Sequence, residues 1–250
     1  MSEIIKSYSD FPFHKRIGEL IRAHSQNKQD IRDVARSLVD MKNVHTMLDL
    51  GCGYGWFEEV LEGQLDLVLG IDCLKENEEA FLENAERIAK RAVFKRMTLP
   101  RPTEIETECL DLIVSTYSLY FFPEVLPEVV RLLCPTGTFL VITHSESMLK
   151  EGEPFFEFNR LKTVIGHFSA ENGEAILRKH FRDVRFVDYP NTLLFNKDES
   201  DDLARYIDFK RGFISRQAGT EVVKDKMLEE LRKEGEMAFN KNDRIFLARK

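Results

Sequence analysis

Residues 44–57 read VHTMLDLGCGYGWF, and this stretch decides the fold. Its first half is rich in Val, Met and Leu and has no proline or glycine, which is typical of a buried β-strand. Gly51, Gly53 and Gly55 follow at alternate positions. Glycine lets the backbone turn through positive φ and lets a ligand lie against the main chain, because it has no Cβ. The stretch therefore predicts a strand, a tight ligand-binding turn and the start of a helix.

The spacing of these glycines separates two classes of nucleotide site. A dinucleotide fingerprint, G-x-G-x-x-G, needs its third glycine at position 56, where this chain has Trp56. The observed order, Asp49-x-Gly51-x-Gly53-x-Gly55, resembles the first motif of the class I S-adenosylmethionine-dependent methyltransferases. Their cofactor has no pyrophosphate to place on a helix N-terminus. The resemblance implies a cofactor loop made of Asp49, Gly51, Cys52, Gly53 and Gly55.

A second landmark lies in residues 65–72, which read LDLVLGID. This apolar run predicts a second buried strand that ends in Asp72, 21 positions after Gly51 (72 − 51). About 20 residues is the usual distance in a βαβ unit between the glycine loop and the acid that accepts hydrogen bonds from a ribose diol. We therefore expect Asp72 to bind the ribose of the cofactor, and residues 56–62 to form the first crossover helix.

The composition limits which classes of protein this chain can belong to. The 43% of hydrophobic residues is enough for a full core, and the formal charge of −7 argues against a general binder of nucleic acid. No apolar run reaches the ~18 residues that span a membrane, so we expect a soluble cytoplasmic protein. The cysteines show neither metal-ligand spacing nor a disulfide framework, so we expect no metal and four reduced thiols. These are Cys52, Cys73, Cys109 and Cys134.

The rest of the pattern predicts an α/β, Rossmann-like fold: a seven-stranded, mostly parallel sheet with helices on both faces. Residues 1–43 carry two amphipathic helices and are expected to form an N-terminal cap. Residues 44–190 are expected to form the cofactor-binding core. A helical insertion is expected at residues 191–242, and the last strand at residues 243–250. Further strands are expected at 92–99, 109–116, 138–143 and 184–189, and further helices at 76–90, 124–134 and 169–180. The resembled fold implies that the last strand inserts antiparallel between the fifth and sixth.

The resemblance also places residues at the ends of later strands. Most relatives carry an acid for the adenine amine after the third strand, and here Thr98 stands in that region. In the fourth motif, Thr116 would touch the cofactor and Tyr117 would face the substrate. His144 follows the fifth strand, at the carboxyl edge where ligands bind in open α/β sheets. Tyr117 and His144 are thus the candidate catalytic residues.

The expected activity is transfer of a methyl group from S-adenosyl-L-methionine to a small-molecule acceptor by in-line displacement. Such a reaction depends mainly on positioning, and a hydroxyl or protonated amine acceptor would also need a base. In layout the chain loosely resembles the histamine N-methyltransferase type, but Arg16 stands where that type carries an amine-binding acid, which favours an anionic acceptor. The alternatives are a non-catalytic cofactor-binding module of the same fold and a nicotinamide-dependent oxidoreductase. The methylated atom and the oligomeric state stay open.

Overall fold

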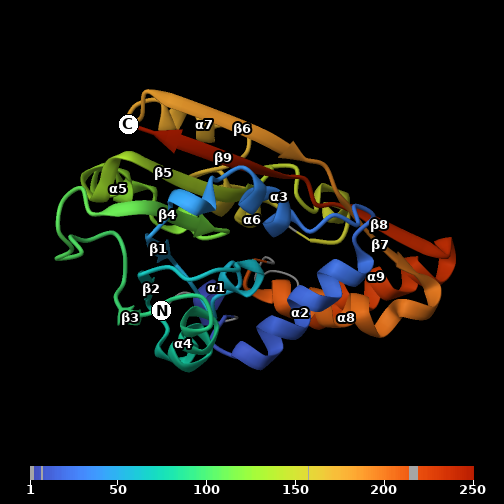
Figure 1. The fold of residues 1–250 in the computed structure, drawn as a ribbon. Helices are drawn as coiled ribbons and strands as arrows, with labels where there is room; N and C mark the ends of the chain where they lie inside the picture. The colour runs from blue at the N-terminus through green and yellow to red at the C-terminus, as the bar shows by residue number, and fades with distance from the viewer. Residues whose placement is uncertain (1–2, 7, 157, 214–218) are drawn as a thin grey trace. The chain divides into compact units, whose positions relative to one another are not determined.

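The computed structural model describes residues 3–6, 8–156, 158–213 and 219–250 (Figure 1). Their contacts divide the chain into two compact units. The core unit contains residues 29–144, 166–189 and 243–250, and the second unit contains residues 1–28, 145–165 and 190–242. The helices expected in residues 1–43 therefore fall in different units, and residues 145–165 join the second unit rather than the core.

The core unit is built on a seven-stranded sheet with the order β3-β2-β1-β4-β5-β9-β6. The neighbouring strands from β3 to β5 are parallel, and β9 pairs antiparallel with both β5 and β6. The predicted seven-stranded, mostly parallel sheet and its inserted last strand are thus confirmed. The strands are β1 (Thr46–Leu50), β2 (Leu67–Asp72), β3 (Ala92–Arg96), β4 (Leu110–Thr116), β5 (Leu133–His144), β6 (Asp183–Tyr189) and β9 (Asp243–Arg249).

The register of this sheet brings four strand ends together at one edge. The carboxyl ends of β1, β2, β4 and β5 lie at one edge because these strands are parallel. Strand β9 runs the opposite way and pairs its first residue, Asp243, with His144, the last residue of β5. A residue close to the end of the sequence therefore reaches the edge where a ligand is expected.

The helices of the core unit are α3 (Ile31–Ser37), α4 (Glu78–Glu86), α5 (Leu126–Leu132) and α7 (Gly173–Leu177). Helix α3 is one of the two helices expected in residues 1–43, and α4, α5 and α7 lie within predicted helical regions but are shorter than predicted. At α7 the reason is local, because Ser169 and Asn172 each accept a hydrogen bond from the other's backbone N–H and hold the chain in a turn. Helix α4 packs closely on β2, since a Cβ at Gly70 would lie only 2.4 Å from the ring of Phe81.

The helix expected at residues 56–62 is absent, and only a short 3-10 helix, Glu58–Val60, follows the glycine loop. Sixteen residues separate β1 from β2 (67 − 50 − 1), and the glycine turn uses the first of them. Backbone carbonyls in this segment accept hydrogen bonds from Arg32 and Arg87, which come from outside it. The prediction was wrong because side chains distant in sequence satisfy the backbone here without an α-helix.

The second unit contains α1 (Glu3–Lys6), α2 (Phe11–His24), α6 (Asn159–Ile165), α8 (Ser200–Lys210) and α9 (Thr220–Glu234). The helices predicted in the insertion correspond to α8 and α9. Sequence analysis missed the antiparallel pair of β7 (Thr192–Asn196) and β8 (Glu236–Asn240). The signal was present as alternation in β7, where Leu193 and Phe195 are buried. No helix among the described residues is both long and apolar enough to cross a bilayer.

Candidate cofactor and acceptor site

The glycine loop turns as its sequence predicts. Gly51, Gly53 and Gly55 have φ values of +72°, +51° and +82°. A Cβ at Gly51 would lie 2.5 Å from the Cβ of Ser118, so packing requires glycine there. A Cβ at Gly53 would meet no atom within 4 Å, so the space beside this residue is open. The loop therefore offers an uncovered stretch of main chain to a ligand.

Asp72 lies at the tip of β2 and binds this loop directly. Its Oδ2 accepts a hydrogen bond from the N–H of Gly53 at 2.9 Å, and its Oδ1 accepts one from the N–H of Leu74 at 2.7 Å. Burial raises the pKa of Asp72, and these backbone hydrogen bonds partly oppose that rise. The side chain of Asn77 and the backbone of Cys73 also interact with this carboxylate, and a ribose diol would add its hydroxyls to these donors. The structure thus joins two residues that sequence analysis assigned to the cofactor.

Two buried carboxyl groups lie behind the loop. Asp49 lies in β1 and is fully buried. Glu58 lies in the segment after the loop and is also fully buried. Among the described residues, no N–H group of another side chain donates to either carboxyl, and the two carboxyls interact with each other. Burial and the charge of Glu58 raise the pKa of Asp49 well above its usual range, and burial raises the pKa of Glu58 to about 7. Sequence analysis missed Glu58, which it treated as part of a helix.

This arrangement fits S-adenosylmethionine. The cofactor carries positive charge on its sulfonium and on its α-ammonium, and a nearby cation stabilises buried carboxyl groups in their charged form. The open main chain at Gly53 and the lone pairs of Asp72 suit the remainder of a nucleoside. Asp49, Glu58, Asp72 and the glycine loop are accordingly the residues that would hold it.

The raised pKa of Glu58 makes stability depend on pH. The pKa is about 7 in the folded protein and 4.5 ordinarily, so the stabilisation is complete below about pH 4.5 and is lost as the pH rises through about 7. We expect Glu58→Gln to reduce this dependence by at most about 3 kcal/mol in the free energy of unfolding, while the buried Asp49 keeps a dependence of its own. Urea unfolding at about pH 5 and about pH 8 measures it. Glu62→Gln, at an exposed position, is the control and should retain the wild-type pH dependence.

A serine pair supports the loop from β4. Ser115 and Ser118 both donate their hydroxyls to the carbonyl of Leu50, at 3.2 Å and 2.6 Å, and their Oγ atoms lie 2.7 Å apart. Ser118 is also the residue that contacts Gly51. Sequence analysis missed both serines, because nothing in the local pattern indicates that they face the end of β1.

A cluster of Tyr117, His144 and Asp243 forms at the edge of the same sheet. The hydroxyl of Tyr117 donates to Oδ2 of Asp243 at 2.7 Å, and Nδ1 of His144 lies 2.7 Å from Oδ1 of Asp243. The rings of Tyr117 and His144 stack with their centroids 4.4 Å apart. Tyr117 has a φ of +55°, which is rare for a residue with a side chain. The structure thus brings together both predicted catalytic residues and adds Asp243, which sequence analysis missed.

Comparison with known proteins agrees with this geometry. The profile of a family described as "Methyltransferase domain" matches residues 48–141, which include the glycine loop, Asp72 and β4. This match identifies a methyltransferase domain within residues 48–141 of the chain. The predicted family, fold and enzyme class are thereby confirmed, together with the cofactor. No curated protein sequence matches the chain.

Solved structures share the fold of this methyltransferase domain. The YcgJ protein from Bacillus subtilis is 16% identical, with a TM-score of 0.56 over 88% of this chain and 98% of that one. BH2331 from Bacillus halodurans C-125 is 12% identical, with a TM-score of 0.57 over 87% of this chain and 97% of that one. Phosphoethanolamine N-methyltransferase 2 from Haemonchus contortus is 17% identical, with a TM-score of 0.50 over 88% of this chain and 52% of that one. At these identities the likeness concerns the fold.

The remaining predicted cofactor residues of the methyltransferase domain lie at or near the carboxyl ends of strands. Thr98 is exposed beyond β3, and Thr116 is half-buried at the end of β4. Cys52 is buried in the loop, and burial raises the pKa of its thiol well above the usual range, which keeps it protonated. Their contacts with the cofactor stay predictions. No group of three His, Cys, Asp or Glu side chains among the described residues could hold a metal ion.

Proposed function

We propose that this protein transfers a methyl group from S-adenosyl-L-methionine to a small-molecule acceptor. The observation that carries the proposal is the hydrogen bond between Gly53 and Asp72, with open space beside Gly53 and the buried acids Asp49 and Glu58 behind the loop. When bound there, the cofactor would supply an electrophilic methyl on a good leaving group. The protein's contribution is then to orient the acceptor and exclude water, which can supply about 7 to 11 kcal/mol.

We assign the role of general base to His144. Asp243 can only accept from Nδ1 of His144 if that nitrogen carries its proton, and this tautomer leaves the lone pair on Nε2. Burial and the charge of Asp243 raise the pKa of Tyr117 well above its usual range, so Tyr117 stays protonated and acts as a hydrogen-bond donor. Of the two candidate catalytic residues, His144 is therefore the base, and Asp243 positions it.

Asp243→Asn is expected to lower kcat by about 100-fold, because the amide cannot hold His144 in the same tautomer while also accepting from Tyr117. The dissociation constant for S-adenosylmethionine should change by less than threefold, since Asp243 lies outside the glycine loop. Steady-state kinetics and calorimetry on the same preparation measure both values. Asp188→Asn is the matched control, because Asp188 is an exposed acid on the neighbouring strand β6 that pairs with Arg244. An unchanged kcat in Asp243→Asn would remove the dyad from the mechanism.

The acceptor class is part of the proposal. A small molecule is supported by the formal charge of −7, which disfavours nucleic acid. One structure with this fold, phosphoethanolamine N-methyltransferase 2 from Haemonchus contortus, was solved with phosphomonomethylethanolamine and S-adenosylhomocysteine. An anionic acceptor stays a prediction from the sequence, where it rests on Arg16. A cytoplasmic location stays a prediction from composition.

The decisive experiment is incubation of the protein with methyl-labelled S-adenosylmethionine and a fractionated metabolite extract. We expect label to appear in a small anionic compound, and to disappear from it with Asp243→Asn. Tight cofactor binding without transferred label would instead support the non-catalytic binding module. Quenching of Trp56 fluorescence by a nicotinamide dinucleotide, and not by S-adenosylmethionine, would support the oxidoreductase.

A further inference from the structure

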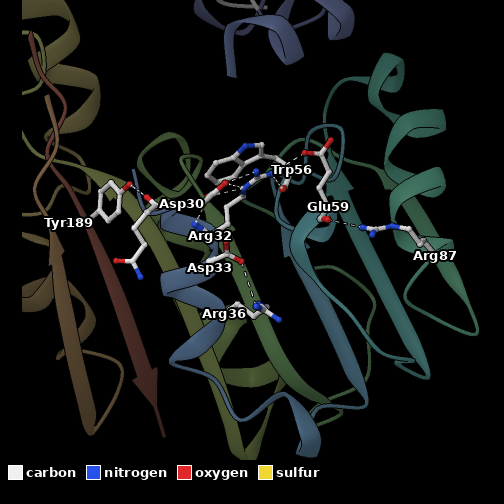
Figure 2. Close-up of polar contacts among 9 residues, drawn as sticks. Asp30, Arg32, Asp33, Arg36, Trp56, Glu59, Arg87 and Tyr189 are labelled. Atoms are coloured by element: carbon white, nitrogen blue, oxygen red, sulfur yellow. Dashed lines mark hydrogen bonds and ion pairs between the residues drawn. The ribbon is translucent and has the colours of Figure 1, made fainter. Parts of the chain in front are cut away.

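The backbone that leaves the glycine loop is held by two arginines from elsewhere in the core unit (Figure 2). Arg32 donates from Nη1 to the carbonyl of Trp56 at 2.9 Å. Arg87 donates from Nη2 to the carbonyls of Glu58 at 2.8 Å and Glu59 at 2.9 Å. These contacts occupy the segment where an α-helix was expected. The course of the chain after Gly55 therefore depends on side chains rather than on helical hydrogen bonds.

Arg32 is held rigidly. Its side chain is only 3% exposed, and its other donors reach Asp30 and Glu59. Nη2 donates to Oδ2 of Asp30 at 2.8 Å, and Nη1 also reaches Oε2 of Glu59 at 2.9 Å. Asp30 in turn caps helix α3 by accepting from the backbone N–H of Arg32. A planar guanidinium bonded in this way has little freedom to move.

The same guanidinium contacts the indole of Trp56, with its Cζ 4.8 Å from the ring centroid. That indole also packs against the ring of Tyr117, with centroids 5.5 Å apart and planes at 49°. Tyr117 then stacks on His144. A continuous series of contacts thus runs from Arg32 through Trp56 to the cluster proposed to bind the acceptor.

We propose that Arg32 is a positioning residue that acts through Trp56 on both halves of the site. Its hydrogen bond to the carbonyl of Trp56 fixes the backbone that leaves the glycine loop. Its contact with the indole of Trp56 fixes the ring against which Tyr117 packs. The inference rests on the proposed function only in taking S-adenosylmethionine as the ligand of the loop. Helix α3 precedes the glycine motif in sequence, and through Arg32 it would contribute to cofactor binding.

Arg32→Met tests the proposal, because methionine fills similar space without donors. We expect the dissociation constant for S-adenosylmethionine to rise at least tenfold in calorimetry. Trp56 is the single tryptophan, so its emission reports the indole directly, and it should shift to longer wavelength with greater quenching by acrylamide. Arg36→Met is the matched control, since Arg36 lies on the same helix and pairs with Asp33 at 3.6 Å. Its dissociation constant should stay within twofold of wild type.

A double-mutant cycle with Trp56→Leu separates positioning from general stability. If Arg32 acts through Trp56, Arg32→Met should raise the dissociation constant at least tenfold in the wild-type background but less than threefold in the Trp56→Leu background. Equal losses in both backgrounds would overturn the proposal. Should Arg32→Met fail to fold because it leaves Asp30 and Glu59 unpaired, Arg32→Lys takes its place in the cycle with the same expected non-additivity.

The outcomes also distinguish this inference from the proposed function. Failure of the wild-type protein to bind S-adenosylmethionine would refute the cofactor assignment itself. Binding by wild type that is unchanged in the Arg32 variants, with unchanged Trp56 emission, would refute only the role of Arg32.

Discussion

Asp72→Ala is expected to weaken S-adenosylmethionine binding at least tenfold, and it is one of the two largest effects that the site predicts. The carboxylate of Asp72 accepts hydrogen bonds from the N–H groups of Gly53 and Leu74, and we expect it to accept from the ribose as well. Alanine removes both, and one hydrogen bond to a charged group contributes about 1.5 to 3 kcal/mol. Calorimetric titration of the folded variant measures the loss.

The control for this change is Asp66→Ala. Asp66 is an exposed acid just before β2, and it pairs with Lys90 at 2.7 Å instead of with the loop. Its removal should leave the dissociation constant within twofold of wild type. The dissociation constant of Asp72→Asn should lie between those of Asp72→Ala and Asp66→Ala. The reason is that an amide can accept from only one of the N–H groups that the carboxylate binds. An unchanged dissociation constant in Asp72→Ala would remove this residue from the site.

Gly53→Ala should abolish high-affinity cofactor binding, with at least a tenfold loss, while the domain stays folded. The added methyl meets no protein atom within 4 Å, so nothing in the fold resists it sterically. It would occupy the open space where the cofactor is expected to pass over the main chain. The φ of +51° costs an alanine about 1 to 2 kcal/mol, so a loss of a few degrees in Tm is expected.

Gly235→Ala is the matched control for this substitution. Gly235 ends helix α9 with a φ of +86°, and a Cβ there also meets nothing within 4 Å. Both variants place an alanine at positive φ, but only Gly53 borders the proposed site. Similar losses of Tm with a loss of affinity only in Gly53→Ala would support the proposal. Full affinity in Gly53→Ala would place the cofactor elsewhere.

Local sequence was most informative where a feature depends on neighbouring residues. The glycine turn follows from φ values that only glycine adopts readily, and the strands follow from short apolar runs. Asp72 could be found because a βαβ unit fixes the distance from the loop to the next strand tip. The absence of a helix at residues 56–62 could not be predicted from local sequence. Its backbone carbonyls accept hydrogen bonds from Arg32 and Arg87, which are distant in sequence.

By itself, the sequence determined the seven-stranded α/β fold, the glycine turn after β1 and the presence of Asp72 at the tip of the next strand. These depend on backbone preferences and on hydrophobic periodicity, which act over a few residues. Only the tertiary structure decided that Asp243 joins His144, that Glu58 lies buried with Asp49, and that Arg32 holds Trp56. The physical reason is that strand register and close packing, rather than local pattern, bring side chains together across 99 positions in the first case and 24 in the last.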